Sequence, residues 1–260
     1  MTPYLRIIGL GEVLWDIFPD GDHFGGAPAN MACTTAGLLG PSGSVRLGSA
    51  LGDDQRGRDA ITFLKQRHVN VSELQITDAP TGTVTVKLND SGQPLFNISK
   101  NSAWDNIVWS ECWHDLAANV DAIYFGSLAQ RGTTSRKTIQ EFIGATSANA
   151  LKVFDMNLRP PFYEPNTLIQ SLKLANVLKV NEEELRVIAK IIPVSGNSID
   201  ILKKLQDDYQ ISCIALTQGT EGAVLINHSE TVNVPSVPTT VVDTVGAGDA
   251  FTAALIIGLL

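Results

Sequence analysis

The stretch VVDTVGAGDAFTAALIIG, residues 241–258, reads as a short strand, a tight turn at Gly246 and Gly248, and an apolar helix. Small residues at the turn allow a ligand to approach the backbone, and the first N–H groups of a helix have no acceptor within it. The helix dipole adds positive potential at the same end, which favours an anion. Such a turn is typical of an α/β fold that binds its ligand at the carboxyl ends of its strands.

Short apolar runs alternate with helix-period segments over most of the remaining chain. We expect strands at 6–10, 45–50, 122–125, 152–156, 177–180 and 214–217. We expect helices at 29–39, 56–67, 133–146, 182–190, 199–209 and 247–259. Apolar strands joined by helices predict a three-layer α/β sandwich, in which helices flank a central, mostly parallel sheet.

Two segments break this alternation and predict a small β-sheet lid. Residues 81–99, TGTVTVKLNDSGQPLFNIS, hold two alternating strands around the turn-forming NDSG, which is a hairpin signal. Residues 13–18, VLWDIF, form another strand-like run ahead of a turn. Because neither segment can be a crossover of the main sheet, we expect lid strands at about 12–24 and 81–100.

The composition excludes several classes of protein. The 260 residues carry 19 Lys and Arg against 27 Asp and Glu, a net charge of −8; without a basic block, no nucleic-acid partner is expected. Cys33, Cys112 and Cys213 are too few and too far apart for a disulfide framework or a CxxC metal site, which fits a reducing cytoplasm. No signal peptide or membrane span is visible, so we expect one cytoplasmic domain, residues 1–260, that does not bind membranes.

Asp249 is the candidate reactive group, because it falls in the first turn of the helix expected at 247–259. A phosphoryl group in transfer spreads negative charge over its oxygens, which backbone N–H groups at Gly246, Ala247 and Gly248 could stabilise. A carboxylate beside them could take the proton of an attacking hydroxyl. The competing interpretation is structural: the glycines only start a helix, and Asp249 only complements its dipole.

Five motifs in order along the chain resemble those of the ribokinase-like (PfkB) carbohydrate kinases. They are GGAPANMACTTAGLLG at 25–40, FDMNLRP at 154–160, KVNEEEL at 179–185, LTQGTEGAVLI at 216–226 and DTVGAGD at 243–249. GGAPAN and FDMNLRP together are most similar to the bacterial fructokinases of that family. The chain stops 11 residues after Asp249, whereas relatives continue for some tens of residues, so the C-terminal part of the family fold is expected to be missing.

The resemblance implies an ATP-dependent transfer of the γ-phosphate to a primary hydroxyl of a sugar, most simply fructose, with Asp249 as general base. Its implied cofactors are ATP and Mg²⁺, with K⁺ as a further candidate, and its implied partner is a second copy of the chain bound through the lid. Two alternatives stay open. One is a kinase for another acceptor, a 2-keto-3-deoxy sugar acid or a nucleoside, and the other is a catalytically impaired sugar-binding protein.

The sugar side of the expected site combines small residues with groups that donate and accept hydrogen bonds, as a sugar's hydroxyls require. The expected contacts are Asp16, Gly25, Gly26, Asn30, Phe96, Arg159 and Asp249. Arg159 offers a planar fork for phosphate oxygens or a carboxylate, and the resemblance gives Asp155 and Asn157 a supporting role. The competing interpretations are an edge charge for Asp16, close packing for the glycine pair and a surface ion pair for Arg159.

The nucleotide side is expected along the later strands. The expected contacts are Asn181, Thr217, Gly219, Gly222, Thr244, Gly246 and Gly248. The resemblance also implies that Glu184 holds Mg²⁺ through water and that Asp243 is a ligand of a monovalent cation. Asn181 and Glu184 could equally be a capping box at a helix start, and the glycines that follow Thr217 could form an ordinary turn of a hairpin.

Overall fold

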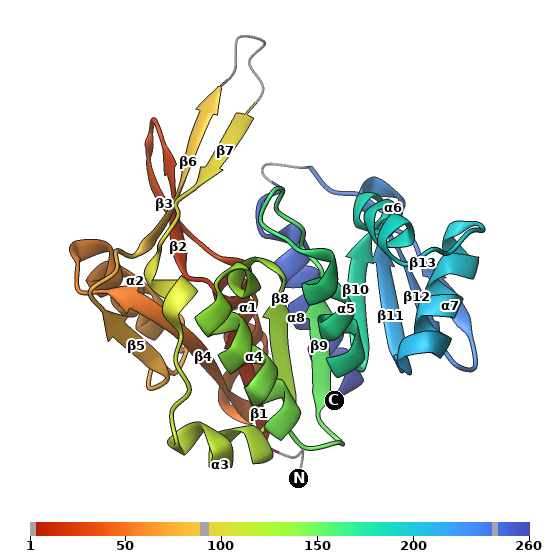
Figure 1. Cartoon of the computed structure of the whole chain (residues 1–260), viewed down its shortest axis with the longest axis horizontal. Helices are drawn as coiled ribbons and strands as arrows, with labels where there is room; N and C mark the ends of the chain where they lie inside the picture. The colour runs from red at the N-terminus through yellow and green to blue at the C-terminus, as the bar shows by residue number, and fades with distance from the viewer. Residues whose placement is uncertain (1–3, 89–93, 241–243) are drawn as a thin grey trace.

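A computed structural model of the chain describes residues 4–88, 94–240 and 244–260. A large sheet forms the middle layer (Figure 1). Its strands, in spatial order, are β13 (Thr231–Val234), β12 (Ala223–Asn227), β11 (Cys213–Thr217), β10 (Val177–Asn181), β9 (Leu151–Asp155), β8 (Ala122–Gly126), β1 (Leu5–Leu10), β4 (Gly43–Gly52) and β5 (Leu74–Thr77). Neighbours from β11 to β5 are parallel, and β12 and β13 add an antiparallel edge.

Helices cover both faces of the large sheet. One face carries α1 (Ala27–Leu39), α2 (Gln55–Gln66) and α8 (Ala247–Leu259), and the other carries α3 (Cys112–Ala118), α4 (Thr133–Ala145), α5 (Pro165–Leu174), α6 (Glu182–Ile191) and α7 (Ser198–Tyr209). The expected three-layer α/β sandwich is therefore confirmed. Among the described residues, no helix is long and apolar enough to cross a membrane.

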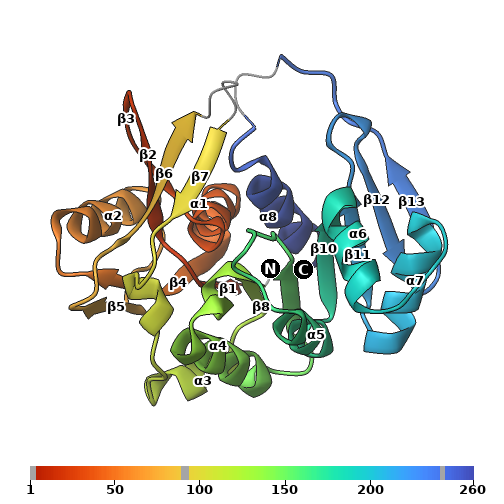
Figure 2. The same ribbon diagram turned by 45° about the horizontal axis from the view of Figure 1, so that its top comes forward.

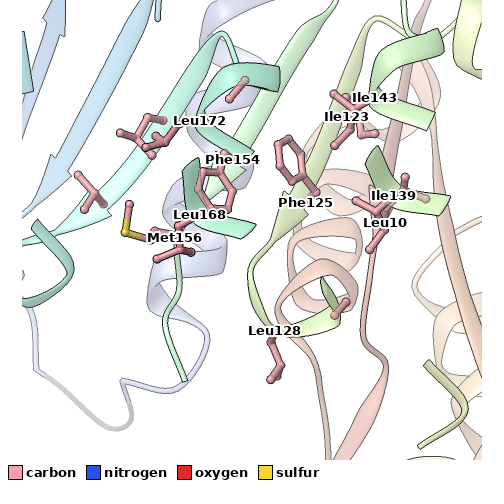
Figure 3. Packing of buried hydrophobic residues seen from close by; sticks show 14 of the residues in the cluster. Leu10, Ile123, Phe125, Leu128, Ile139, Ile143, Phe154, Met156, Leu168 and Leu172 are labelled. Carbon is pink, nitrogen blue, oxygen red and sulfur yellow. The ribbon is translucent and has the colours of Figure 1, made fainter. Parts of the chain in front are cut away.

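The central strands are apolar on both sides because successive residues face different helical layers. In β9, Val153 packs in the cluster beneath α1 and α8, whereas Phe154 packs in the cluster beneath α4 and α5. Phe154 stacks on Phe125 of β8 with ring centroids 5.2 Å apart, and Leu168 of α5 lies close by (Figure 3). Burial on both faces explains why the sequence shows apolar runs rather than alternation.

A second, small sheet projects from the large one (Figures 1 and 2). Its strands, in order, are β3 (Gly21–Gly25), β2 (Leu14–Phe18), β6 (Gly82–Leu88) and β7 (Pro94–Ile98). β6 and β7 pair antiparallel, as the hairpin signal predicts, and the turn expected at 89–92 lies outside the described residues. β2 joins the two hairpins by pairing with β6, so the expected small sheet is confirmed.

The carboxyl ends of the parallel strands come together at one edge of the large sheet, the edge from which the small sheet projects (Figure 1). The start of α1 follows β3 of the small sheet, and α1 packs against α8. The residues expected to bind the sugar and the phosphate are thereby delivered to one place by elements far apart in the chain.

Candidate active site

Asp249 lies where the starts of two helices meet. α8 begins after Gly246, whose φ of 76° is left-handed and suits glycine, and Asp249 falls in the first turn of that helix. Its side chain is buried, and Asn30 of α1 donates a hydrogen bond from Nδ2 to Asp249 Oδ2 at 2.9 Å. These two residues are 219 positions apart in the sequence. The structure therefore brings Asn30, a residue expected to bind the sugar, into direct contact with the candidate base Asp249.

The surroundings of Asp249 bring the pKa of its carboxyl group closer to neutral pH. Burial raises the pKa of its carboxyl group to about 6, since the charged form is poorly solvated. The hydrogen bond from Asn30 and the charges of Lys179 and Arg159 act in the opposite direction, whereas the charge of Asp155 adds to the rise. A carboxylate with such a pKa is mostly ionised at pH 7 and is a stronger base than an ordinary aspartate.

Glu12 is a second buried carboxyl group in the site, and the sequence reasoning missed it. It follows β1, is 3% exposed, and accepts a hydrogen bond at Oε1 from the N–H of Ala27 at 3.3 Å. Oε2 has no hydrogen-bond partner among the described residues. Burial raises the pKa of Glu12 to about 7, and the charge of Asp249 contributes to the rise. A charged residue directly after IIGLG, residues 7–11, was the available signal.

We expect Glu12→Gln to raise the free energy of unfolding by about 1–3 kcal/mol at pH 8. The pKa of Glu12 is about 7 in the folded protein against 4.5 for the free side chain, so ionisation of Glu12 destabilises the fold as pH rises through this interval. Gln keeps an acceptor for Ala27 and carries no charge. Urea denaturation at pH 8 measures the gain, which should nearly vanish at pH 4, below both pKa values. A variant that is no more stable than the wild type at pH 8 would refute the effect.

In the antiparallel pair of β2 and β3, Asp16 lies opposite His23 and Gly25 opposite Leu14, and the Asp16 side chain extends toward Gly25. A Cβ at Gly25 would lie 2.6 Å from Asp16 Oδ2, so glycine makes room for the carboxylate. Asp16 is half-buried, and burial raises its pKa, against the charges of Arg159 and His23. The absence of a side chain at Gly25 therefore leaves the space that the Asp16 carboxylate occupies.

Gly26 is fixed by its backbone. Its φ is 108°, and a Cβ there would overlap the carbonyl oxygen of Glu12. The same residue precedes the first turn of α1, where Asn30 N–H donates to Gly26 O at 2.9 Å. Gly26 therefore sets how closely α1, and with it the Asn30 side chain, approaches the end of β1.

Arg159 lies in the loop after β9 and is exposed. Its positive charge lowers the pKa values of Asp16, Glu12 and Asp249, so the guanidinium group is near all three carboxyl groups. The competing interpretation required a surface ion pair for Arg159. Within the described part of the chain, Arg159 forms no ion pair. Phe96 pairs with Val86 between β7 and β6, and its side chain lies outside the described part.

Asp155 is buried whereas Arg159 is exposed, although the two residues are only four positions apart. Asp155 ends β9 fully buried beneath α8 and pairs with Lys179 at 3.0 Å. The chain then leaves the strand, and Asn157 adopts a left-handed φ of 37°. The period-two alternation of a strand therefore no longer applies between Asp155 and Arg159.

Asn181 and Glu184 form the capping box of α6. Asn181 Oδ1 accepts from Glu184 N, and Glu184 Oε2 accepts from Asn181 N, both at 2.9 Å. Glu184 Oε1 also accepts from Leu158 N at 2.9 Å, so the buried carboxylate ties the loop after β9 to α6. Burial raises the pKa of Glu184. Because both oxygens already accept backbone hydrogen bonds, the side chain fits a cation held through water better than one bound directly.

The remaining nucleotide candidates lie along the same edge. Thr217 ends β11 directly beside Asn181 of β10, and Gly219 and Gly222 shape the turn into β12 with φ values of 59° and 100°. The hairpin turn is thus present, at the same edge of the sheet as Asn181. Across residues 4–88, 94–240 and 244–260, no group of three His, Cys, Asp or Glu side chains could hold a metal ion.

The expected anion hole used the backbone N–H groups of Gly246, Ala247 and Gly248, and the N–H of Ala247 is already engaged in the turn before α8. Ala247 N–H donates to the carbonyl oxygen of Thr244 at 3.2 Å, which closes the turn. Gly248 lies against a buried cation, because a Cβ there would be 3.0 Å from Lys179 Nζ. Asp243 lies outside the described residues.

Comparisons with known proteins agree on one family. Residues 20–260 match the pfkB family carbohydrate kinases. The fructokinase of Klebsiella pneumoniae is 31% identical over 266 residues, which cover 98% of this chain and 84% of that protein. The fructokinase of Salmonella typhimurium is 31% identical over 263 residues, covering 96% and 83%.

Solved structures give the same result. The Pyrococcus horikoshii sugar kinase PH1459 in complex with ATP is 28% identical, with a TM-score of 0.78 over 97% of this chain and 84% of that one. The fructokinase of Vibrio cholerae O395 in its form with fructose, ADP and calcium ion bound is 25% identical, with a TM-score of 0.79 over 97% and 83%.

Proposed function

The chain belongs to the pfkB family of carbohydrate kinases, and we propose that it transfers the γ-phosphate of ATP to a primary hydroxyl of fructose. The observation that carries the proposal is the buried Asp249 in the first turn of α8, whose carboxylate accepts a hydrogen bond from Asn30 of α1. Fructose is supported by the fructokinases at 31% identity and by the fructose bound in the Vibrio cholerae structure.

Asp249 acts as the general base in this proposal. The sugar hydroxyl gives its proton to Asp249 as its oxygen attacks the γ-phosphorus, and the bond to the ADP leaving group breaks. Asn30 orients the carboxylate through its 2.9 Å hydrogen bond. Because Ala247 N–H is engaged with Thr244, we assign the contacts with the phosphoryl oxygens to the amides of Gly246 and Gly248, aided by the helix dipole.

The acceptor lies between the small sheet and α1. Asp16 and Asn30 bind sugar hydroxyls, Gly25 and Gly26 let the sugar approach the backbone, and Arg159 closes the polar side of the cleft. Phe96 is assigned to the same side. Closure of the small sheet over the sugar would exclude water, which otherwise competes as the acceptor of the phosphoryl group.

The nucleotide lies on the other side of the transferred phosphate. We assign its phosphates and ribose to Asn181, Thr217, Gly219, Gly222 and Thr244 along the edge of β10 and β11. Mg²⁺ bound to the ATP phosphates would neutralise their charge, with Glu184 holding its water shell. Asp243 stays the candidate ligand for K⁺. ATP in the PH1459 structure and a calcium ion in the Vibrio cholerae structure support ATP as the nucleotide and a cation beside it.

A panel of acceptors tests the proposal. We expect ADP release to require a sugar and to show its highest kcat/KM with fructose among ketoses, aldoses, 2-keto-3-deoxy sugar acids and nucleosides. Sugar binding in a calorimeter without ATP binding or turnover would instead indicate a sugar-binding protein of this fold.

The acid acceptors are the second candidate, because Arg159 is exposed and free of ion pairs among the described residues. Its guanidinium group could pair with a substrate carboxylate. Arg159→Gln distinguishes the two: it should lower kcat/KM for a sugar acid far more than for fructose only if the acid is the true substrate.

Two further expectations stay proposals. We propose a cytoplasmic location and pairing of two copies through the small sheet. A dimer in light scattering at micromolar concentration would support the pairing, and a monomer would count against it.

A further inference from the structure

Lys179 and Asp155 form a buried ion pair that the proposed mechanism does not use. They are register neighbours on β10 and β9, and Lys179 Nζ lies 3.0 Å from Asp155 Oδ1. Their side chains are 7% and 0% exposed. A buried ion pair is often no more stabilising than an apolar pair of the same size, because both charges lose their hydration. Stability alone is therefore a weak reason for this pair.

The pair is attached to the helix that carries Asp249. The Thr252 hydroxyl, three residues after Asp249 on α8, lies 3.2 Å from Asp155 Oδ2 and 2.9 Å from Gly248 O, so its proton is shared between two acceptors. Tyr124 OH of β8 donates to the same Asp155 oxygen at 3.2 Å. On its other side, Lys179 Nζ packs against Gly248, where a Cβ would lie only 3.0 Å away.

The two charges act on Asp249 in opposite directions. Asp155 raises the pKa of Asp249 and Lys179 lowers it, so the intact pair leaves burial as the main cause of the rise. The pKa of Lys179 is itself raised: burial opposes the rise, and the charges of Asp155, Glu184 and Asp249 outweigh it. The polar and titratable groups that face Asp249 from the surrounding elements are Glu12, Asn30, Tyr124, Asp155, Arg159 and Lys179.

We propose that Lys179 and Asp155 are positioning residues for the phosphoryl transfer: together they hold the start of α8 and balance the charge beside Asp249. The inference rests on the proposed role of Asp249 as base. Thr252 transmits the position of the pair to α8, and Lys179 sets the potential beneath Gly248, next to the assigned phosphoryl site.

Paired variants test the charge balance through the pH dependence of kcat/KM for the acceptor. The acidic limb is the part of the profile in which kcat/KM rises with pH as Asp249 ionises. Lys179→Met removes the positive charge and should move this limb to higher pH, on the order of one unit. Asp155→Asn removes the negative charge and should move it to lower pH by a similar amount. The double variant should return close to the wild-type limb. A merely structural pair would lower activity or stability in both single variants without opposite shifts. Shifts in the same direction, or none, overturn the charge balance.

Thr252→Val tests the positioning without touching either charge, and it guards against single variants that fail to fold. We expect kcat to fall about tenfold with little change in the KM for the acceptor, because a small displacement of the base is costly. An unchanged kcat overturns the positioning role. Asp249→Asn separates this inference from the proposed function: if that variant keeps its activity and its acidic limb, the base itself is wrongly assigned.

Discussion

Asp249→Asn should lower kcat by at least about a hundredfold while the dissociation constant of fructose stays within about threefold of the wild type. Asn has the shape of Asp and can still accept the hydrogen bond from Asn30, which is 2.9 Å long in the wild type. It cannot take a proton from the sugar hydroxyl. Steady-state kinetics and calorimetric titration with fructose measure the two quantities on one preparation.

Asp200→Asn is the matched control for this variant. Asp200 also lies in the first turn of a helix, α7, but it is exposed and caps only its own helix start. If Asp249 merely complemented a helix dipole, the two variants would behave alike. We expect Asp200→Asn to keep wild-type turnover, and a similar loss in both variants would count against a base at Asp249.

Gly26→Ala should be strongly damaging to both stability and sugar binding. At a φ of 108° an alanine is strained, and its Cβ would overlap the carbonyl oxygen of Glu12, which is backbone and cannot rotate away. We expect the free energy of unfolding to fall by about 2–4 kcal/mol. We also expect the KM for the sugar to rise at least about tenfold, because α1 and Asn30 would move away from Asp249.

Gly37→Ala is the control on the same helix. A Cβ at Gly37 would meet no atom within 4 Å, and the residue is in the middle of α1. Alanine there should be neutral or stabilising by up to about 1 kcal/mol. Urea denaturation of both variants makes the comparison. If Gly26→Ala were as stable as Gly37→Ala, the backbone argument for the glycine pair would fail.

The layers of the fold could be predicted because their signals are local. β8, β9 and β10 are short apolar runs followed by polar residues, and β6 and β7 alternate around a turn-rich segment. Other elements gave weaker signals. β13 is only four residues long and exposed throughout, and α3 is only seven residues long. The strands β5 and β13 and the helices α3 and α5 were not assigned, and β12 was anticipated only through the hairpin turn after Thr217.

Parts of the site could be predicted from motifs, but not its contacts. The sequence indicates Asn30 and Asp249 separately, and only the packing of α1 against α8 shows that they touch. Glu12 and Lys179 were missed as members of the site because a buried charge is recognised by its partners, which come from distant strands. Spacing alone also did not decide whether Glu184 caps a helix or holds Mg²⁺ through water, and the structure shows its capping hydrogen bonds.

The pH dependence of kcat/KM for fructose tests the central claim, that the Asp249 carboxylate takes the proton of the acceptor hydroxyl. With a pKa of about 6 for Asp249, the logarithm of kcat/KM should rise with unit slope up to about pH 6 and level off above it. The residual activity of Asp249→Asn should lack this limb. A wild-type profile that is flat from pH 5 to 8, or a limb that persists in the variant, would contradict the claim.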